Sequence, residues 1–529
     1  MRLLQTVKRN AVFSISVTGV LILHLIFAWL PLDRLEGFTF LWSKGPLIDD
    51  SYIIFKISRD LADWFSSVIS SPHLTSGVQP LIALLYSIFF LIFWNSKELP
   101  IHLALSLNAF LGFFAHILLY CLLRKVASRA IATFLISIWI WSPYVLNQTI
   151  NGMETPLALL LLLSVLNYYW KINKETLFAY RSWVILGILL GIGFWTRVDL
   201  GLVGVVIAID QAWLAIHDNP QSRSFRLRNV LLCSLTALAI ASPWIVFTLS
   251  RTGNILPISG KGVRQITSLT FNYLNPNHPG FPYMMFVRFI REFFLFQPLV
   301  ALSKNIAWQL FISGLGLIGL VLALKDRNLR TLLRPIWFFQ VIMLASYISF
   351  IGGFWHLNRY LYPVYTLLLL LHAVTLHSIE SKIAWKKWTV ALICFVLFVP
   401  YAFSYTLQLY SYFSKPRPSR YFAAAHFIKS RIPSEEKIGT FQSGALSYWL
   451  DNQVINLDGV INKEAYLNVK NKTLGKYLEN QKVEYLVEET YLFRMWDHYL
   501  EGQLSENFSL INSKPGRGWY KVGIYKSVK

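Results

Sequence analysis

Two adjacent aspartates, Asp49 and Asp50, lie between the first apolar run of the chain and a following amphipathic stretch. A carboxylate pair can take a proton from an attacking hydroxyl or bind a divalent cation. It can also simply cap a helix and meet the positive end of its dipole. A role in a site is favoured by the position next to a membrane helix, where ionisable groups are costly and often functional.

Further ionisable residues stand at the ends of later apolar runs: Glu154, Arg197, Asp199, His356 and Arg359. Each has a structural alternative. Glu154 can begin a helix ahead of a proline in its first turn, and Arg197 and Asp199 can pair with each other. His356 can hydrogen-bond the backbone, and Arg359 can extend toward lipid headgroups.

Carboxylates and cations gathered near a membrane surface suit the transfer of a sugar from a lipid phosphate. Because the leaving group is already a good anion, a general acid is not required. A carboxylate must take the proton of the attacking hydroxyl, and a cation must hold the departing phosphate. Asp49 or Asp50 suits the first role, and Arg197, His356 or Arg359 suits the second.

Composition indicates that lipid is the main solvent of this chain. Its 529 residues are 55% hydrophobic and 14% charged, whereas soluble proteins carry roughly 25% charged residues. We therefore expect a mostly α-helical, polytopic membrane bundle. The apolar runs that predict its helices are 11–30, 78–94, 100–123, 131–149, 154–170, 182–196, 198–216, 229–249, 306–324, 333–351, 360–378 and 388–408.

The net charge of +22 arises mainly in short loops. From residue 124 onward, Lys and Arg occupy every second loop, which the positive-inside rule places in the cytoplasm. The alternate loops, with every candidate residue named above, then lie on the extracytoplasmic face. No basic stripe or nucleic-acid module is present, so nucleic-acid binding is excluded.

The charge map contains one conflict near the N-terminus. Both the N-terminus and the loop 124–129 are basic and should be cytoplasmic, which requires an even number of crossings between them. Three apolar runs separate them. We therefore expect about eleven crossings from twelve runs, with either 78–94 or 100–123 failing to cross fully.

The chain is expected to form two domains. Residues 1–410 would be the transmembrane module, with a first outer loop at 31–79 and a long outer loop at 250–305. Residues 411–529 would form a small extracytoplasmic α/β domain, because strand-like and helical patterns alternate there. The expected strands are 437–441, 454–457, 483–488 and 519–525, and the expected helices are 444–450 and 463–479. No Gly-rich phosphate fingerprint is present.

Several motifs occur in a recognisable order. They are Asp49-Asp50-Ser51-Tyr52, Gly152-Met153-Glu154-Thr155-Pro156, Thr196-Arg197-Val198-Asp199, Gly352-Gly353-Phe354-Trp355 with Arg359-Tyr360, and Asn456-Leu457-Asp458-Gly459 in the tail. In this order the chain resembles the GT-C superfamily of polytopic glycosyltransferases that use polyprenyl-phosphate sugars. The likeness is closest to the branch around the mycobacterial terminal arabinofuranosyltransferase.

The resemblance implies an inverting transferase with Asp49 as the catalytic base, Asp50 beside it, and a lipid donor site within the membrane. Val198 and Phe354 stand where that branch has a proline and an acid, which leaves the sugar open between a pentose and a hexose. Contacts to the donor phosphate and sugar are expected from Glu154, Arg197, Asp199, His356 and Arg359.

We therefore expect transfer from a polyprenyl-phosphate sugar to a hydroxyl of a cell-envelope glycan, lipid or protein, outside the cytoplasmic membrane. No organic cofactor is required by this chemistry, and a divalent metal stays open. A transporter or flippase of lipid-linked glycans is one alternative, and it predicts internal repeats, which we do not find. A non-catalytic membrane scaffold is the other, and it predicts that Asp49→Asn leaves function intact.

Overall fold

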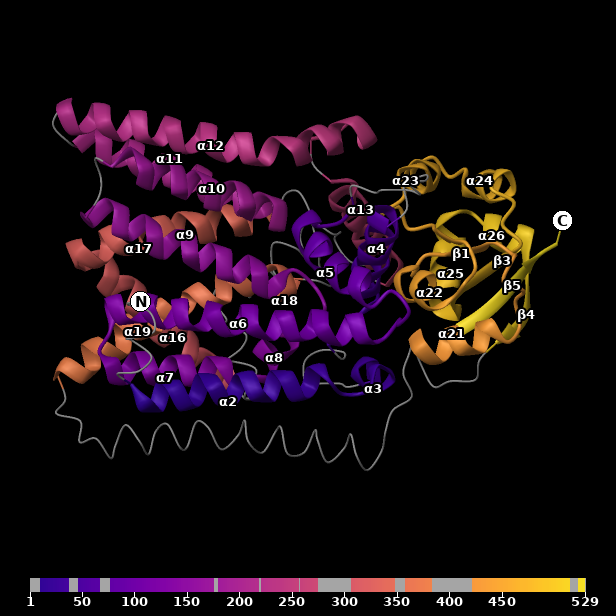
Figure 1. Ribbon diagram of the computed structural model, residues 1–529, viewed down its shortest axis with the longest axis horizontal. Helices are drawn as coiled ribbons and strands as arrows, with labels where there is room; N and C mark the ends of the chain where they lie inside the picture. The colour runs from indigo at the N-terminus through magenta and orange to yellow at the C-terminus, as the bar shows by residue number, and fades with distance from the viewer. Residues whose placement is uncertain are drawn as a thin grey trace.

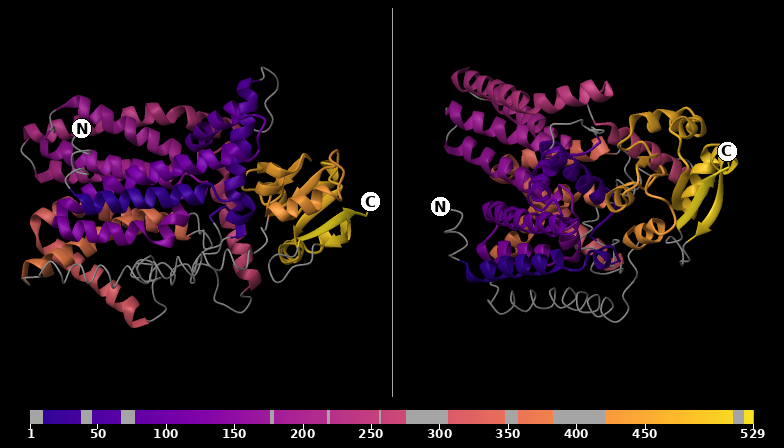
Figure 2. Two further views of the ribbon diagram at one scale, coloured as in Figure 1. Left: turned by 60° about the horizontal axis from the view of Figure 1, so that its bottom comes forward. Right: turned by 45° about the vertical axis from the view of Figure 1, so that its right-hand side comes forward.

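The computed structural model describes residues 10–37, 46–66, 77–175, 179–217, 220–255, 257–274, 306–347, 357–382, 421–513 and 522–528. Long helices lie roughly parallel in a bundle, and a small domain with a sheet sits at one end of it (Figure 1). Two further views show the same arrangement (Figure 2). The protein is thus a multi-pass helical membrane protein with a C-terminal α/β domain, as the sequence predicts.

The helices of the membrane module are α2 (Ala11–Ala28), α3 (Leu32–Gly37), α4 (Asp49–Ser66), α5 (Pro80–Ile92), α6 (Leu99–Val126), α7 (Arg129–Ile140), α8 (Pro143–Thr149), α9 (Thr155–Glu175), α10 (Tyr180–Thr196), η1 (Val198–Leu200), α11 (Gly201–His217), α12 (Pro220–Thr252), α13 (Ile258–Leu274), α16 (Ile306–Lys325), α17 (Arg327–Ser346), α18 (Leu357–Tyr360) and α19 (Tyr362–Lys382). Within the described residues, six helices are long and apolar enough to cross a membrane, or seven if the bent pair α7 and α8 is one span. The run 388–408 lies outside the described residues, so eleven crossings stays a prediction.

The start of the bundle resolves the conflict in the charge map. Asn10, at the start of α2, donates to the hydroxyl of Tyr120 near the end of α6 (3.0 Å). At the opposite ends of both helices, His102 Nδ1 hydrogen-bonds the carbonyl of Ala28 (2.7 Å). The two helices are therefore antiparallel. α5 has 13 residues, or about 20 Å of helix, too short for a hydrocarbon core of about 30 Å. We therefore expect run 78–94 to be the one that does not cross.

The expectation of a single helix over 131–149 is wrong. The chain bends by 67° between α7 and α8. Ser142 caps the second helix by accepting from the amide of Tyr144 (3.2 Å), and Pro143 occupies its first position. Because proline lacks an amide hydrogen, it fits the first turn of a new helix better than the interior of a continuous one.

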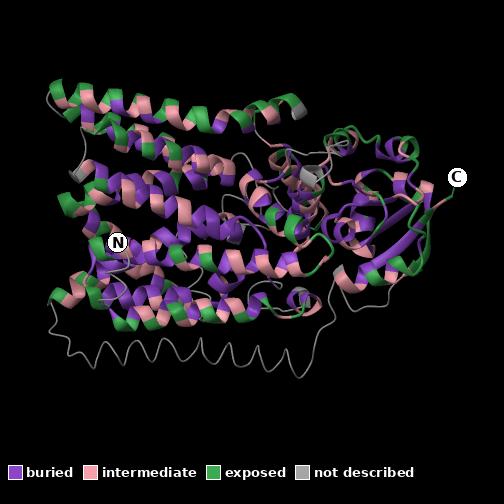
Figure 3. Ribbon diagram, in the orientation of Figure 1, coloured by how far each residue is buried: buried purple, intermediate pink, exposed green. Residues whose placement is uncertain are grey.

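Burial follows the membrane environment. The largest fully buried side chains include Trp139, Trp183 and Tyr169 in the bundle and Trp496 in the α/β domain. α12 at its edge is exposed along much of its length (Figure 3), with Leu231 and Leu238 more than half accessible. An apolar helix face of this kind is stable only against lipid.

The α/β domain contains α21 (Tyr421–Lys429), β1 (Ile438–Thr440), α22 (Gly444–Trp449), β2 (Val454–Asn456), α23 (Lys463–Lys470), α24 (Leu474–Asn480), β3 (Tyr485–Glu489), α25 (Thr490–Tyr499), α26 (Gln503–Asn507), β4 (Phe508–Ser513) and β5 (Val522–Ser527). The strand order is β2-β1-β3-β5-β4. β1 pairs in parallel with β2 and β3, whereas β5 is antiparallel to β3 and β4.

Two expectations for this domain need correction. The helix expected over 463–479 is two helices, because Lys472 adopts a left-handed backbone conformation (φ 53°) between α23 and α24. The sequence patterns also missed α25 and β4. β4 is an edge strand whose residues 509–512 are all exposed, Leu510 and Ile511 among them, so it lacks the regular apolar alternation that predicts a half-buried strand.

Candidate active site

Asp49 joins the membrane module to the α/β domain. It is the first residue of α4, and its carboxylate accepts hydrogen bonds from the amides of Gly444 (2.9 Å) and Ala445 (2.8 Å). The sequence predicted that Asp49 caps the helix that follows it. In the structure Asp49 caps α22, a helix about 400 residues away in sequence. A Cβ on Gly444 would lie 2.0 Å from the carbonyl oxygen of Asp49, so the contact requires glycine.

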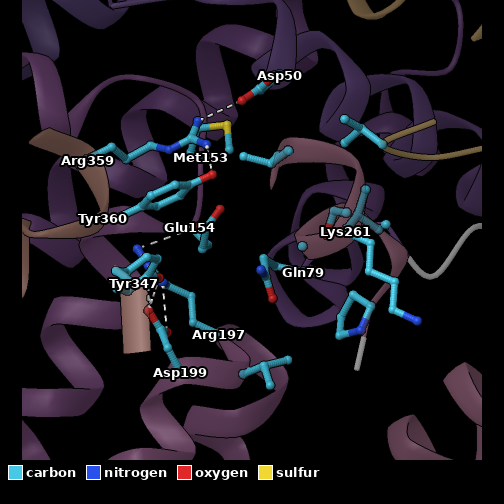
Figure 4. A pocket seen from close by; sticks show the side chains of 18 of the residues that line it. Asp50, Gln79, Met153, Glu154, Arg197, Asp199, Lys261, Tyr347, Arg359 and Tyr360 are labelled. Atoms are coloured by element: carbon cyan, nitrogen blue, oxygen red, sulfur yellow. Dashed lines mark hydrogen bonds and ion pairs between the residues drawn. The ribbon is translucent and has the colours of Figure 1, made fainter. Parts of the chain in front are cut away.

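Asp50 forms an ion pair with Arg359 across a cavity (Figure 4). Its Oδ2 lies 3.0 Å from Nη1 of Arg359, which comes from α18. The Asp50 side chain is 36% exposed and that of Arg359 is 10% exposed. The same guanidinium lies over the ring of Tyr360. Arg359 is therefore fixed in place, while the carboxylate beside it remains accessible to a ligand.

Arg197, between α10 and η1, is the centre of a second group. It donates to both oxygens of Asp199 (3.1 and 2.6 Å) and to the hydroxyl of Tyr347 at the end of α17 (2.6 Å). The hydroxyl of Tyr347 donates in turn to Asp199. The local ion pair considered from the sequence is thus present, and Tyr347 holds it against the bundle.

Glu154 lies beside this group and is incompletely bonded. Its Oε1 is 3.9 Å from Nη1 of Arg197, and both side chains are only 4% exposed. Within the described residues, neither Oε2 of Glu154 nor Nη1 of Arg197 has a hydrogen-bond partner. Buried polar atoms are normally hydrogen-bonded. The unused donor and acceptor therefore mark a place where a polar ligand would gain interactions.

These residues line one cavity of about 2100 Å³. Its polar end holds Asp49, Asp50, Glu154, Arg197 and Arg359, and Lys261 lies on the other side of the cavity in this view (Figure 4). From there it continues between α10, α11 and α12. The lining of that part is apolar and includes Leu190, Ala208, Val230, Ala237, Leu238 and Ile245.

The α/β domain and α13 complete the wall. Phe441, Gln442, Asp458 and Glu489 of the α/β domain line the cavity, as do Lys261 and Arg264 of α13. In an outer loop, basic side chains of this kind are either solvated charges or contacts to a donor phosphate. Lys261 donates to Asn254 (2.7 Å) and is exposed at that contact. Both basic groups make the electrostatic potential of the cavity more favourable for an anion.

Six of the residues expected at the site converge, namely Asp49, Asp50, Glu154, Arg197, Asp199 and Arg359. His356 lies outside the described residues. Sequence reasoning missed Tyr347 and the position of Asp458 on the cavity wall. Tyr347 gave no signal because it lies within an apolar run, whereas Asp458 belongs to a tail motif that was noted without a function. In the described part of the chain, no three His, Cys, Asp or Glu side chains are arranged to hold a metal ion.

Comparisons with known proteins agree with this architecture. Residues 76–247 match the family of dolichyl-phosphate-mannose-protein mannosyltransferases, and residues 410–525 match a domain of unknown function (DUF8728). No curated protein sequence matches the chain. The structure resembles ArnT from Cupriavidus metallidurans bound to undecaprenyl phosphate, with a TM-score of 0.56 and 14% identity over 97% of this chain and 98% of that one.

The structure also resembles the archaeal oligosaccharyltransferase AglB from Archaeoglobus fulgidus in complex with an inhibitory peptide and a dolichol-phosphate. The TM-score is 0.54, with 13% identity over 97% of this chain and 74% of that one. The chain therefore has the fold of these membrane glycosyltransferases, and the GT-C prediction is confirmed for the fold. The arabinofuranosyltransferase branch stays a prediction.

Proposed function

We propose that this protein is an inverting glycosyltransferase that moves a sugar from a polyprenyl phosphate to a hydroxyl of a cell-envelope glycan, lipid or protein. One observation carries the proposal: a single cavity joins a carboxylate and guanidinium end to an apolar groove between α10, α11 and α12. A lipid phosphate has the same division, with an anionic head and a long apolar chain. The segment that matches the mannosyltransferase family contains α10, α11 and most of α12.

In the proposed reaction the acceptor hydroxyl attacks the anomeric carbon of the donor sugar. The new carbon–oxygen bond forms as the bond to the phosphate oxygen breaks, and the polyprenyl phosphate leaves with the electron pair. The hydroxyl proton passes to a carboxylate, for which Asp49 remains our first assignment. Each carboxylate oxygen has two lone pairs, so the amides of Gly444 and Ala445 can orient Asp49 without by themselves using its whole acceptor capacity.

The cations at the polar end would stabilise the leaving phosphate. Arg359 and Arg197 are both buried and directed toward the cavity, where an ionic interaction is much stronger than in water. Nη1 of Arg197 and Nε of Arg359 lack hydrogen-bond partners within the described residues. These donors suit phosphate oxygens or sugar hydroxyls, whereas Asp199 and Tyr347 would hold Arg197 in position.

The proposal is tested by sugar transfer from synthetic donors. Purified protein in lipid nanodiscs would be incubated with polyprenyl-phosphate mannose, glucose and arabinose, together with an envelope extract as the acceptor. We expect transfer from at least one donor, and a loss of at least about 100-fold in Asp49→Asn. Asp63→Asn, on the same helix α4, is the matched control and should behave as wild type.

The outcomes separate a glycosyltransferase from a transporter and test the assignment of the base. Transfer that depends on Asp49 supports the glycosyltransferase. Movement of an intact lipid-linked sugar across vesicles, without transfer to any acceptor, would instead support a transporter. Full transfer by Asp49→Asn would keep the enzyme and remove Asp49 as its base. The donor that is used also decides between a pentose and a hexose, and hence whether the predicted arabinofuranosyltransferase branch applies.

A further inference from the structure

Asp458 is an acidic residue of the α/β domain that lines the cavity shared with the membrane module. It follows β2 and lines the same cavity as Asp49 and Asp50. Its Oδ1 accepts a hydrogen bond from the amide of Val460 (2.9 Å), which fixes the carboxyl group at the start of a turn. The mechanism above gives this carboxyl no role.

The turn that carries Asp458 is packed directly against the membrane module. A Cβ on Gly77, ahead of α5, would lie 2.4 Å from the carbonyl oxygen of Val460. A Cβ on Gly262 of α13 would lie 3.0 Å from the carbonyl oxygen of Gly459. Two backbone segments of the membrane module thus contact the turn with no side chain between them. Such contacts hold the turn to within a narrow range of positions.

The same turn is connected to the residues that Asp49 caps. Asn456 donates from Nδ2 to the hydroxyl of Ser443 (2.9 Å), and Ser443 directly precedes Gly444, whose amide binds Asp49. On the other side, Asn462 donates to the backbone carbonyl of Asn456 (2.9 Å). Asp49 and Asp458 are therefore positioned by one hydrogen-bonded assembly that spans both domains.

We propose that Asp458 is a third carboxyl of the reaction centre, a positioning residue whose negative charge raises the proton affinity of Asp49 and Asp50. The proposal rests on the glycosyl transfer proposed above and deepens it. Such a residue would offset the contacts of the other two carboxylates, which weaken both as bases. Asp49 accepts two amide hydrogen bonds and Asp50 pairs with Arg359, and both kinds of contact favour an ionised, weakly basic carboxylate.

A third negative charge acts in the opposite direction, because like charges disfavour one another's ionised form. The pKa of Asp458 is raised to about 7, mainly by burial and in smaller part by the charges of Asp49 and Asp50. Hydrogen bonds from Val460 and Asn456 act against this rise. Other charged or titratable groups along this part of the cavity are Lys261 and Arg264 from α13, Arg359 beyond Asp50, and Glu489 and Tyr491 from the α/β domain.

The sign of the pH effect follows from these contacts. Below about pH 7 Asp458 is protonated and neutral, so it does not assist the base. Above that pH it is ionised, and proton transfer to Asp49 or Asp50 becomes more favourable. The kcat of the wild-type protein should therefore rise as pH increases through about 7.

The test is the pH profile of kcat between pH 5.5 and 9, measured on the full chain in nanodiscs with whichever polyprenyl-phosphate sugar the wild type uses. We expect Asp458→Asn to lower kcat about tenfold at pH 8 and to lose the rise near pH 7, while the KM for the donor changes less than about twofold. Asp458→Glu should keep a rise in kcat. Asp451→Asn, an exposed carboxylate of the same domain, is the control and should match wild type.

Each outcome decides the question. If Asp458→Asn keeps the wild-type kcat and pH profile, Asp458 is not part of the centre, although the transferase would stand. If that variant does not fold, Asp458→Glu is used instead. Because glutamate places the carboxyl group differently, the pH midpoint of the rise in kcat should shift, and an unshifted midpoint would contradict the proposal. A wild-type protein that transfers no sugar at all would overturn the proposed function itself.

Discussion

The membrane module contains two buried ionic clusters on the same helices, and they differ in how completely they are bonded. The site cluster consists of Glu154, Arg197, Asp199 and Tyr347. The distal cluster consists of Tyr169, Asp210, Gln211 and Arg334. Asp210 on α11 lies 11 residues after Asp199, which precedes that helix, and Arg334 on α17 lies 13 residues before Tyr347, which follows that helix. At 1.5 Å per residue, the two clusters are about 15 to 20 Å apart along the helices.

The distal cluster is almost fully satisfied. Asp210 accepts from the hydroxyl of Tyr169 and from Nε of Arg334, both at 2.5 Å. Gln211 donates to Tyr169 (2.5 Å) and accepts from Arg226 (2.9 Å). Within the described residues, Nη2 of Arg334 is the cluster's buried side-chain atom without a hydrogen-bond partner. Neither Asp210 nor Arg334 lines the large cavity.

The site cluster faces open space and keeps unused polar atoms. Nη1 of Arg197 and Oε2 of Glu154 are buried without hydrogen-bond partners among the described residues, and both side chains border the cavity. A buried charge in a membrane protein is thus not a sufficient sign of function. The two clusters differ in how many of their buried polar atoms are hydrogen-bonded. The distal cluster has the bonding expected of a structural ion pair, and the site cluster has the bonding expected of a ligand-binding site.

After the assigned base Asp49, the largest expected effect on activity is at Asp50. Asp50→Asn removes the carboxylate that orients Arg359 (3.0 Å) and that shares the acidic centre, so we expect transfer to fall by about 10² to 10⁴-fold. The rate would be measured in nanodiscs, with folding checked by the thermal unfolding midpoint. Asp60→Asn is the control, because Asp60 lies on the same helix and pairs with Lys56 at the surface. Equal losses in both variants would contradict a specific role.

The distal cluster should give the reverse result. Arg334→Gln leaves Asp210, whose side chain is 3% exposed, buried without its cation, which should cost about 3 to 5 kcal/mol in stability. Transfer by the protein that remains folded should stay within about twofold of wild type. Arg330→Gln, an exposed position on the same helix α17, is the control for unfolding. A large loss of transfer by correctly folded Arg334→Gln would remove the distinction between the clusters.

The sequence predicted the location of the site better than its contacts. Charge alternation in the loops placed Asp49, Glu154, Arg197 and Arg359 on one face, because membrane insertion imposes a side on every loop. It could not show that Asp49 caps α22, since that contact joins residues about 400 positions apart. It also could not show the role of Tyr347, because a tyrosine near the end of an apolar run is expected to be an interfacial anchor.

A satisfied acid outside the membrane extends the comparison. Glu488 in β3 accepts from the amides of Phe441 (2.8 Å) and Gln442 (3.1 Å), and burial raises its pKa from 4.5 to about 8. Glu488 loses its proton at a lower pH in the unfolded chain than in the folded protein, so between these two pKa values the folded state binds more protons. The free energy of unfolding should therefore fall as pH rises from about 4.5 to about 8. The free energy of unfolding should decrease by at most about 1.4 kcal/mol for each unit by which folding raises this pKa.

Glu488→Gln should reduce the pH dependence of stability without abolishing transfer. This is expected of an acid whose hydrogen bonds are satisfied within the protein. The measurement is the thermal unfolding midpoint of the full chain between pH 5 and 8. Glu435→Gln, at an exposed position of the same domain, is the control. An unchanged slope in Glu488→Gln would show that its raised pKa has no effect on stability.

The smallest effect is expected at the exposed edge of the contact between the two domains. Lys97 pairs with Asp451 (3.0 Å), and their side chains are 30% and 53% exposed. Solvent and salt screen such pairs, so Lys97→Ala should change stability by about 1 kcal/mol or less. Transfer should be unchanged, because Asp49 still caps α22 beside it. A loss of transfer in Lys97→Ala as large as that in Asp49→Asn would mean that the exposed ion pair positions the α/β domain. Buried groups with unsatisfied hydrogen bonds would then no longer be the feature that identifies the site.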